Sequence, residues 1–186
     1  MLGYAFCGSF CTHAAAVREL QKLIAAGYEV QPIASETVWN TDTRFGKAVA
    51  LREELERICG RQVIHSVVDA EPLGPAMPLD ALIVAPCTGN TLAKIANGIT
   101  DTAVCMAAKA HLRSDRPLVI TLASNDALSA NLKNIATLLS RKHVYFVPMN
   151  QDDPEKKPHS LVADFSLLMP TLNAAFEGRQ FRRLFL

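Results

Sequence analysis

Apolar and polar positions along this chain form blocks that predict strands and helices in turn. Short apolar runs end at glycine or polar residues, which is typical of strands. Between these runs, apolar residues recur every three or four positions, as at Ala16, Val17, Leu20 and Leu23, which predicts amphipathic helices. We expect strands at residues 2–7, 28–34, 63–68, 81–85, 118–123 and 144–147, and helices at 12–26, 45–58, 91–97, 102–112, 129–140 and 160–176, the last kinked at Pro170.

The order of these elements indicates the fold class. The runs that begin at Ala81, Leu118 and Val144 are continuously apolar, as expected of strands buried on both faces of a parallel sheet. Strands that alternate with helices favour an α/β architecture. We therefore predict a single three-layer, Rossmann-like (flavodoxin-like) domain over residues 1–186, with a mostly parallel six-stranded sheet. Residues 150–186 add a polar loop and a C-terminal helix that packs on the domain.

Composition and charge narrow the function classes. The 186 residues carry a formal net charge of +1, which gives no bulk electrostatic reason to expect nucleic acid as a partner. No apolar run approaches the roughly 18 residues of a membrane span, and the first ten residues read as a strand rather than a signal peptide. The cysteines lack CxxC or zinc-type spacing, so we expect reduced thiols, a cytoplasmic location and no metal site. The five cysteines are Cys7, Cys11, Cys59, Cys87 and Cys105.

Polar, mostly uncharged residues follow four of the predicted strands. In open parallel sheets, ligands bind beyond the carboxyl ends of the strands. Hydroxyls, amides and free N–H groups at helix N-termini suit a phosphate or another polar group. The alternative is that these residues only form turns and helix caps. The predicted cofactor-binding residues are Gly8, Ser9, Ser35, Thr37, Thr88, Gly89, Asn90 and Thr91.

A nicotinamide dinucleotide site is not expected on this chain, because Gly8 has no glycine at positions 10 or 13 to complete the G-x-G-x-x-G pattern. For proton transfer, His13 is the first candidate, against the alternative of a surface histidine on a helix. Asn125 and Lys94 are candidates for holding an anionic substrate, although Lys94 can equally be a solvated helix lysine. Cys87 is a weaker candidate nucleophile, activated by a helix N-terminus, or simply a buried thiol.

One run carries a family resemblance. PCTGNTLAKIANGITDTAV (residues 86–104) resembles a signature of the flavoprotein superfamily, which includes flavin-containing cysteine decarboxylases and flavin prenyltransferases. The resemblance extends over residues 3–148 and implies FMN as a cofactor. Two features depart from the decarboxylases: the nearest histidine before Pro86 is His65, and residues 122–125 read LASN instead of P-x-M-N. Cysteine decarboxylation is therefore not the expected activity.

A narrower resemblance covers the whole chain. TLASNDALSANLKNI (residues 121–135) and VYFVPMNQDDPEKKPHSLVADFSLL (residues 144–168) resemble segments of the dipicolinate synthase B-subunit family of spore-forming bacteria. The resemblance implies oxidation of dihydrodipicolinate, a small dicarboxylate, to dipicolinate in the mother cell. It also implies a partner, the dipicolinate synthase A subunit, which carries NADP.

The relatives further imply a homo-oligomer, a trimer or dodecamer, and the alanine-rich segment 103–110 is a candidate for the helix at its interface. Two other functions stay open at this point. One is a self-sufficient FMN-dependent decarboxylase or flavin prenyltransferase. The other is a non-catalytic scaffold subunit with a vestigial flavin pocket.

Overall fold

The central sheet of the protein is parallel. The computed structural model describes residues 1–74 and 76–185. Five strands run in the order β2-β1-β3-β4-β5, and every residue of these strands is buried. Burial on both faces explains their continuously apolar sequences. The strands are β1 (Leu2–Phe6), β2 (Val30–Ala34), β3 (Ala81–Cys87), β4 (Leu118–Ser124) and β5 (Val144–Phe146).

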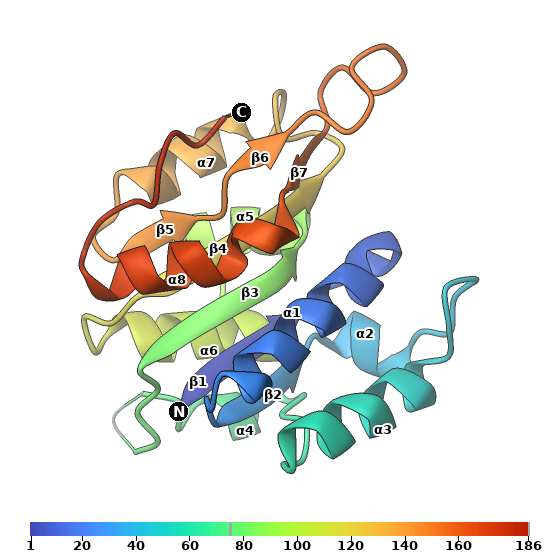
Figure 1. Cartoon of the computed structure of the whole chain (residues 1–186), viewed down its shortest axis with the longest axis vertical. Coiled ribbons are helices and arrows are strands. Elements are labelled where there is room, and N and C mark those ends of the chain that lie inside the picture. The colour runs from blue at the N-terminus through green and yellow to red at the C-terminus, as the bar shows by residue number, and fades with distance from the viewer. Residues whose placement is uncertain (75, 186) are drawn as a thin grey trace.

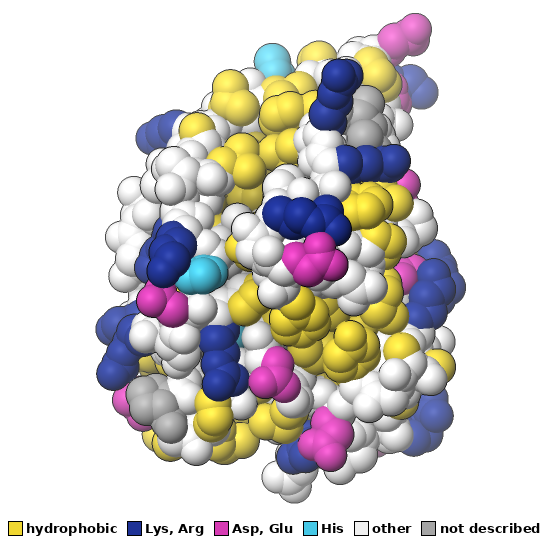
Figure 2. Space-filling view, turned by 60° about the vertical axis from the view of Figure 1, so that its left-hand side comes forward, with side chains coloured by type: hydrophobic (Ala, Val, Ile, Leu, Met, Phe, Trp, Pro, Cys, Tyr) yellow, Lys and Arg dark blue, Asp and Glu magenta, His cyan; other side chains and the backbone are white. Residues whose placement is uncertain are grey.

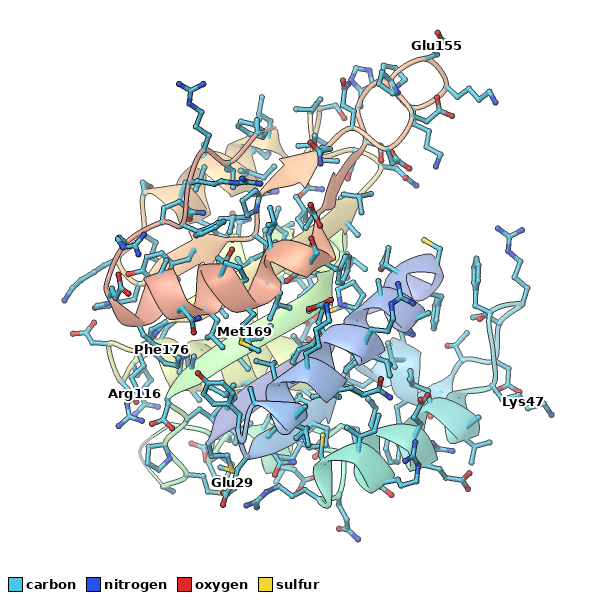
Figure 3. The ribbon with its side chains drawn as sticks, viewed as in Figure 1. Glu29, Lys47, Arg116, Glu155, Met169 and Phe176 are labelled. Atoms are coloured by element: carbon cyan, nitrogen blue, oxygen red, sulfur yellow. The ribbon has the colours of Figure 1, made fainter. Side chains whose placement is uncertain are left out.

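Two short antiparallel strands extend the sheet beyond the prediction. β7 (Leu161–Ala163) pairs with the carboxyl end of β4, and β6 (Met149–Asn150) pairs with β7. The seven-stranded, mostly parallel sheet confirms the predicted fold class. The connection between β6 and β7 projects from the body of the molecule, and Glu155 lies at its tip (Figure 3).

Helices cover both faces of the sheet (Figure 1). α1 packs against α3 and α8 on one side, and α6 packs against α4 and α5 on the other, where α5 also contacts α7. The sheet is therefore the middle of three layers. The helices are α1 (His13–Ala25), α2 (Glu36–Asn40), α3 (Ala48–Cys59), α4 (Val67–Ala70), α5 (Gly89–Ala96), α6 (Ala103–Leu112), α7 (Leu132–Leu139) and α8 (Leu168–Phe176), with 3₁₀ turns at Phe10–Thr12 and Phe165–Leu167.

The predicted strand at residues 63–68 is wrong. Ile64 forms only an isolated bridge with Ile33, and the chain then turns into the one-turn helix α4. Ser66 caps this helix, because its hydroxyl oxygen accepts a hydrogen bond from the backbone N–H of Asp69 at 3.1 Å. The Ser-x-x-Asp spacing is a helix-start signal, and it outweighs the β-branched residues around it.

The predicted helix at residues 160–176 is also shorter than expected. Residues 161–163 form β7, and Asp164 then caps a 3₁₀ turn that leads into α8. Pro170 is the third residue of α8. Backbone N–H groups in a first turn have no helical acceptor, so proline fits there without the kink that we expected.

Most side chains of the alanine-rich helix α6 are buried within the fold. Ala103, Ala107, Ala108 and Ala110 are each at most 2% exposed, and α6 packs on α4 and the sheet. The small side chains of α6 therefore serve packing within the chain, and the segment is not available as the interface between copies that its sequence suggested.

The last described residues cover an open edge of the sheet. The Gln180 side chain accepts a hydrogen bond from the N–H of Phe146 at 3.1 Å and donates one to its carbonyl oxygen at 2.6 Å. The N–H of Met149 donates to the carbonyl of Leu184. The tail thus satisfies backbone groups of β5 and β6 that a further strand would otherwise occupy.

On the face drawn in Figure 2, the basic side chains of the described residues are interspersed with acidic ones. No helix among residues 1–74 and 76–185 is both long and apolar enough to cross a membrane.

Candidate functional site

The carboxyl ends of the parallel strands lie side by side, as the fold class predicts. The N–H of Cys7, after β1, donates to the carbonyl of Pro86 in β3 at 3.2 Å. A Cβ on Gly8 would lie 3.5 Å from the Thr37 methyl group, so the β1 and β2 ends are in contact. A Cβ on Gly89 would lie within 2.8 Å of three polar side chains from the β4 end. All four loops therefore meet at one edge of the sheet.

His13 is held within this edge as the first residue of α1. Its Nε2 lies 2.8 Å from the carbonyl oxygen of Cys7, so the ring donates a hydrogen bond there. The ring also makes an edge-on contact with Phe6 and a tilted contact with Phe10. Burial lowers the pKa of His13 below its ordinary value, and the Cys7 hydrogen bond opposes that shift. The ring is therefore neutral near pH 7, with Nδ1 as the nitrogen left to accept a proton.

The β2 end uses its polar residues mainly for capping. The Ser35 hydroxyl oxygen accepts a hydrogen bond from the N–H of Val38 at 3.4 Å and begins α2. Glu36 reaches across to α6, where its Oε1 accepts a hydrogen bond from the N–H of Ala103 at 3.0 Å. The other oxygen, Oε2, is buried with no hydrogen-bond partner among the described residues. Thr37 is exposed beside Gly8. Glu36 was not among the residues predicted from the sequence, because only its tertiary contact with α6 distinguishes it.

Thr88 and Thr91 are also capping residues. The Thr88 side-chain oxygen accepts a hydrogen bond from the N–H of Thr91 at 3.2 Å and begins α5. The same hydroxyl donates to the Thr91 hydroxyl at 3.1 Å. Thr91 is 6% exposed, whereas Asn90 is exposed. Of the residues predicted in this loop, Asn90 is thus the side chain most open to a ligand.

Gly89 is close to the protein's own polar groups rather than to open space. A Cβ at this position would overlap the Ser124 hydroxyl and would lie 2.6 Å from the Asn131 amide nitrogen and 2.8 Å from an Asp126 carboxylate oxygen. Such distances leave no room for a side chain. The glycine therefore allows the start of α5 to approach the β4 end closely.

Asp126 is the centre of a hydrogen-bond network at this point. Its carboxylate accepts from the Ser124 hydroxyl and from the Asn131 amide, at 3.0 and 2.9 Å for the two oxygens. The network continues from Asn134 to Asn131 and from Asn97 to Asn134. The Ser124 hydrogen bond chiefly lowers the pKa of Asp126, so this carboxyl is ionised at neutral pH. A negative charge thus lies beside the N-terminus of α5, where a phosphate would otherwise be favoured.

Asn125 and Lys94 have different partners in the structure. Asn125 is exposed, and its Oδ1 accepts from the Ser160 hydroxyl at 3.5 Å, next to the β6–β7 connection. Lys94 is in the last turn of α5, and its ammonium nitrogen lies 2.9 Å from the Asp101 carboxylate. The strand ends thus bring Asn125 to the same edge as Asn90, while Asp101 already neutralises Lys94.

The buried thiols near this edge are unreactive. Burial raises the pKa of Cys7 to about 12 and raises that of Cys87 well above its ordinary value. Both groups are therefore protonated thiols at neutral pH, which agrees with the interpretation of Cys87 as a buried thiol rather than the weaker alternative of a nucleophile, because burial dominates over the helix N-terminus. Among residues 1–74 and 76–185, no three His, Cys, Asp or Glu side chains are arranged to hold a metal ion.

A cleft of about 440 Å³ opens beside the strand ends, between α1 and α3. His13 is the one predicted site residue that lines it. Apolar side chains form much of its lining, including Phe10, Val38, Phe45 and Leu51, and the charged lining residues are Arg18, Lys47 and Glu54. This cleft was not predicted from the sequence, because its residues come from α1, α2, α3, the 3₁₀ turn before α1 and the loop before α3, which no single motif connects.

The comparisons with known proteins agree with this architecture. The family model described as "Flavoprotein" matches residues 3–165. The chain belongs to the Flavoprotein family. Within it, the chain is 43% identical to the B subunit of dipicolinate synthase from Bacillus subtilis (strain 168), over 96% of this chain and 90% of that protein. Membership follows from both the family model and this nearly full-length similarity.

Two solved structures are similar to this chain in fold. A crystal structure of the dipicolinate synthase B subunit from Bacillus halodurans C superposes with a TM-score of 0.91 at 39% identity, over 100% of this chain and 95% of that one. A dodecameric FMN-dependent UbiX-like decarboxylase from Escherichia coli O157:H7 superposes with a TM-score of 0.60 at 24% identity, over 79% of each chain. The second likeness shows a shared fold.

The sequence placed His65 in a strand, but the residue lies in the segment before α4. Its ring stacks on Trp39, with centroids 3.6 Å apart and planes 6° from parallel. The Arg52 guanidinium lies 4.3 Å from the Trp39 ring centroid. These contacts connect α2, α3 and the segment before α4. They give His65 a packing role in this flavoprotein-family chain.

Proposed function

We propose that this protein is the B subunit of a dipicolinate synthase and, together with the A subunit, oxidises dihydrodipicolinate to dipicolinate. The observation that carries the proposal is the similarity to the B subunits of two Bacillus synthases over nearly the whole chain, in sequence and in fold. We place the reaction in the mother cell of a sporulating bacterium. The A subunit would supply the NADP site, in keeping with the absence of a G-x-G-x-x-G pattern after β1.

The chemistry asks little of the protein beyond positioning. The reaction would remove a hydride and a proton from the dihydropyridine ring and leave it aromatic; oxidised NADP on the A subunit would supply the hydride acceptor, and a base would take the proton. The protein must hold the dicarboxylate against the hydride acceptor and receive the proton. His13 is the candidate base, because its neutral ring keeps Nδ1 free to accept a proton while Nε2 donates to Cys7.

FMN binding is part of the proposal, and the residues fit it in one orientation. Gly8, Ser9 and Thr37 offer hydroxyls and close backbone approach at the β1 and β2 ends. The ionised Asp126 opposes a phosphate at the start of α5. We therefore place a flavin phosphate near Ser9, Ser35 and Thr37, where Asn90 and Asn125 would be the residues that hold the uncharged part of the flavin. Bound flavin would supply a two-electron acceptor at this edge.

We also propose a homo-oligomer, a trimer or dodecamer, since one structural relative is dodecameric. Because α6 is buried within the chain, the contact between copies would use other surfaces. Size-exclusion chromatography with light scattering measures the assembly directly. A monomer at all concentrations would contradict this part of the proposal.

The test of the main function combines purified proteins. The A subunit is mixed with dihydrodipicolinate and NADP, with and without this chain, and dipicolinate formation is followed by its ultraviolet absorbance. We expect the chain to raise the rate severalfold at saturating substrate. If the A subunit on its own forms product equally fast, this chain has no part in catalysis.

A scaffold role is the second candidate, favoured by one observation: several candidate catalytic groups are already engaged by the protein itself. Lys94 pairs with Asp101, Cys87 is a protonated thiol, and the His13 ring is bonded to Cys7. Substituting Asn90 and Asn125 by alanine distinguishes the two roles. Full synthase activity in the double variant supports the scaffold, and a loss supports the catalytic role. A self-sufficient flavin enzyme would instead show a flavin absorbance spectrum after reconstitution and turnover without the A subunit.

A further inference from the structure

The cleft between α1 and α3 has the size and lining of a small-molecule site. Its volume of about 440 Å³ lies within the range of roughly 300 to 1,000 Å³ that is typical of such sites. Val38 and Leu51 are apolar lining residues, and the rings of Phe10 and Phe45 contribute aromatic surface. A planar ring is the shape that such aromatic surfaces contact most fully.

Phe45 is presented to this cleft by an ordered loop. The N–H of Thr43 donates to the carbonyl of Gly46 at 2.9 Å, and the N–H of Phe45 donates to the Thr43 hydroxyl at 3.1 Å. The loop is fastened to α3, because the N–H of Ala48 donates to Asp42 at 2.9 Å. Yet the Phe45 side chain is 54% exposed. The Arg44 guanidinium carbon lies over this ring, 4.8 Å from its centroid, and the exposed remainder of the ring borders the cleft.

The charges of the cleft favour an anion. Arg18 and Lys47 line it, and within residues 1–74 and 76–185 neither forms an ion pair. Glu54 is the acidic lining residue, and His13 is neutral, so the lining carries one net positive charge. Lys47 lies at the outer edge of the molecule (Figure 3), whereas Arg18 lies on α1, the helix that begins at His13.

The strand ends, by contrast, disfavour a dicarboxylate. Asp126 is ionised beside the start of α5, and the Glu36 carboxyl caps α6. The predicted cation, Lys94, is paired with Asp101. The Asp126 charge therefore repels a doubly charged anion from the start of α5, and the paired Lys94 does not offset that repulsion.

We propose that the cleft between α1 and α3 binds the planar dicarboxylate, with the ring against Phe10 and Phe45 and a carboxylate on Arg18. The identity of the ligand rests on the proposed synthase function. A guanidinium matches a carboxylate with two parallel hydrogen bonds, which gives both affinity and orientation. His13 lines the cleft and bonds to Cys7 at the β1 end. The ligand would therefore lie directly beside the cofactor edge, which is the edge formed by the carboxyl ends of the strands, where we place FMN.

Calorimetric titration of the full chain with pyridine-2,6-dicarboxylate tests the site. We expect Arg18→Gln to weaken binding about tenfold, because one charge-assisted contact is lost. Ala14→Phe, which adds a ring at an exposed lining position, abolishes binding. Lys94→Gln and the matched control Arg57→Gln, an exposed arginine of α3 outside the cleft, leave it unchanged.

The outcomes separate this site from the synthase function. No binding by the natural chain, or binding lost in Lys94→Gln and kept in Arg18→Gln, overturns the proposed site. If the chain stimulates the A subunit, yet Arg18→Gln leaves KM for dihydrodipicolinate unchanged, the function stands and the site falls. If the chain binds the dicarboxylate through Arg18 but does not stimulate the A subunit, the site stands and the synthase function falls. Thermal unfolding of each variant verifies that it is folded.

Discussion

The ring of His13 is fastened to the backbone of Cys7, with 2.8 Å between Nε2 and the carbonyl oxygen. This bond fixes the tautomer of the one predicted site histidine, which adjoins both the strand ends and the cleft. We predict that His13→Ala destabilises the fold by about 1 to 2 kcal/mol, since a hydrogen bond and two aromatic contacts are lost. The free energy of unfolding is measured in urea.

The same variant tests the proton-accepting role. If His13 is the base, His13→Ala lowers kcat of the reconstituted synthase by at least about tenfold while the chain is still folded. His159→Ala, an exposed histidine, is the matched control. Unchanged kcat in His13→Ala would leave the residue with a structural role alone.

Stability should fall in mild acid because of a second buried histidine. His111 is fully buried, its Nε2 donates to the carbonyl of Pro117 at 2.8 Å, and its Nδ1 has no partner among the described residues. Burial lowers the pKa of His111 below its ordinary value of 6.5. The unfolded chain therefore binds a proton first, and folding stability decreases as the pH falls below about 6.5.

Urea unfolding at about pH 7.5 and about pH 5.5, on either side of the ordinary histidine pKa, measures this loss. His111→Gln should reduce the difference between the two pH values, since the titrating group is gone. His159→Gln should keep the full difference, because that side chain is exposed. An equal pH dependence in all three proteins would show that His111 is not responsible.

Replacing either of two glycines at the strand ends by alanine should have different effects on folding stability. Gly89→Ala brings a methyl group into overlap with the Ser124 hydroxyl, and we expect a destabilisation of about 2 kcal/mol or more. Gly8→Ala meets nothing closer than 3.5 Å, so stability should change by less than about 0.5 kcal/mol. Thermal and urea unfolding compare the two variants.

Flavin titration of Gly8→Ala then tests the cofactor edge separately. Because the fold is intact, weaker FMN binding in this variant reports lost access to the backbone at the β1 end. Equal FMN affinity in Gly8→Ala and the natural chain would argue against a flavin phosphate beside Gly8.

Lys94 should matter little for either stability or ligand binding. Its partner Asp101 is more than half exposed, so Lys94→Gln should cost less than about 1 kcal/mol. Because the ammonium is already neutralised, synthase activity should also stay within about twofold of the natural chain. A large fall in activity without a fall in stability would restore Lys94 as a substrate-binding residue.

The Gln180 side chain should contribute more to folding stability than its position near the end of the chain suggests. Gln180→Ala leaves the N–H and carbonyl of the fully buried Phe146 without their partner. We expect a loss of about 1 to 3 kcal/mol in unfolding free energy. Gln151→Ala, whose amide bonds to Pro158 on an exposed loop, is the control and should be nearly neutral. Equal stability of both variants would contradict the edge-sealing role.

The sequence predicted the central sheet well, for a physical reason. Strands such as Ala81–Cys87 and Leu118–Ser124 are buried on both faces, and only continuous apolar runs satisfy that environment. The same reasoning gave a wrong strand at residues 63–68. The β-branched side chains there favour a strand, but Ser66 favours the start of a helix, and the helix α4 forms. Two-residue β6 is too short for any periodicity.

The site was less predictable, because side-chain roles depend on tertiary partners. The convergence of the polar loops follows from parallel strands and was foreseeable. The pairing of Lys94 with Asp101 and the reach of Glu36 to α6 were not, since each depends on how a helix packs. The cleft between α1 and α3 is likewise a product of packing.

The tail over β5 and β6 also bears on how this protein should be handled. A shortened chain that stopped before residue 180 would leave the outer backbone of Phe146 and Met149 bare. Bare strand backbone recruits other chains, so such a fragment would precipitate readily even though its interior was unchanged. We therefore expect the yield of dissolved protein from an expression culture to depend on a short tail that lies outside both the strand ends and the cleft.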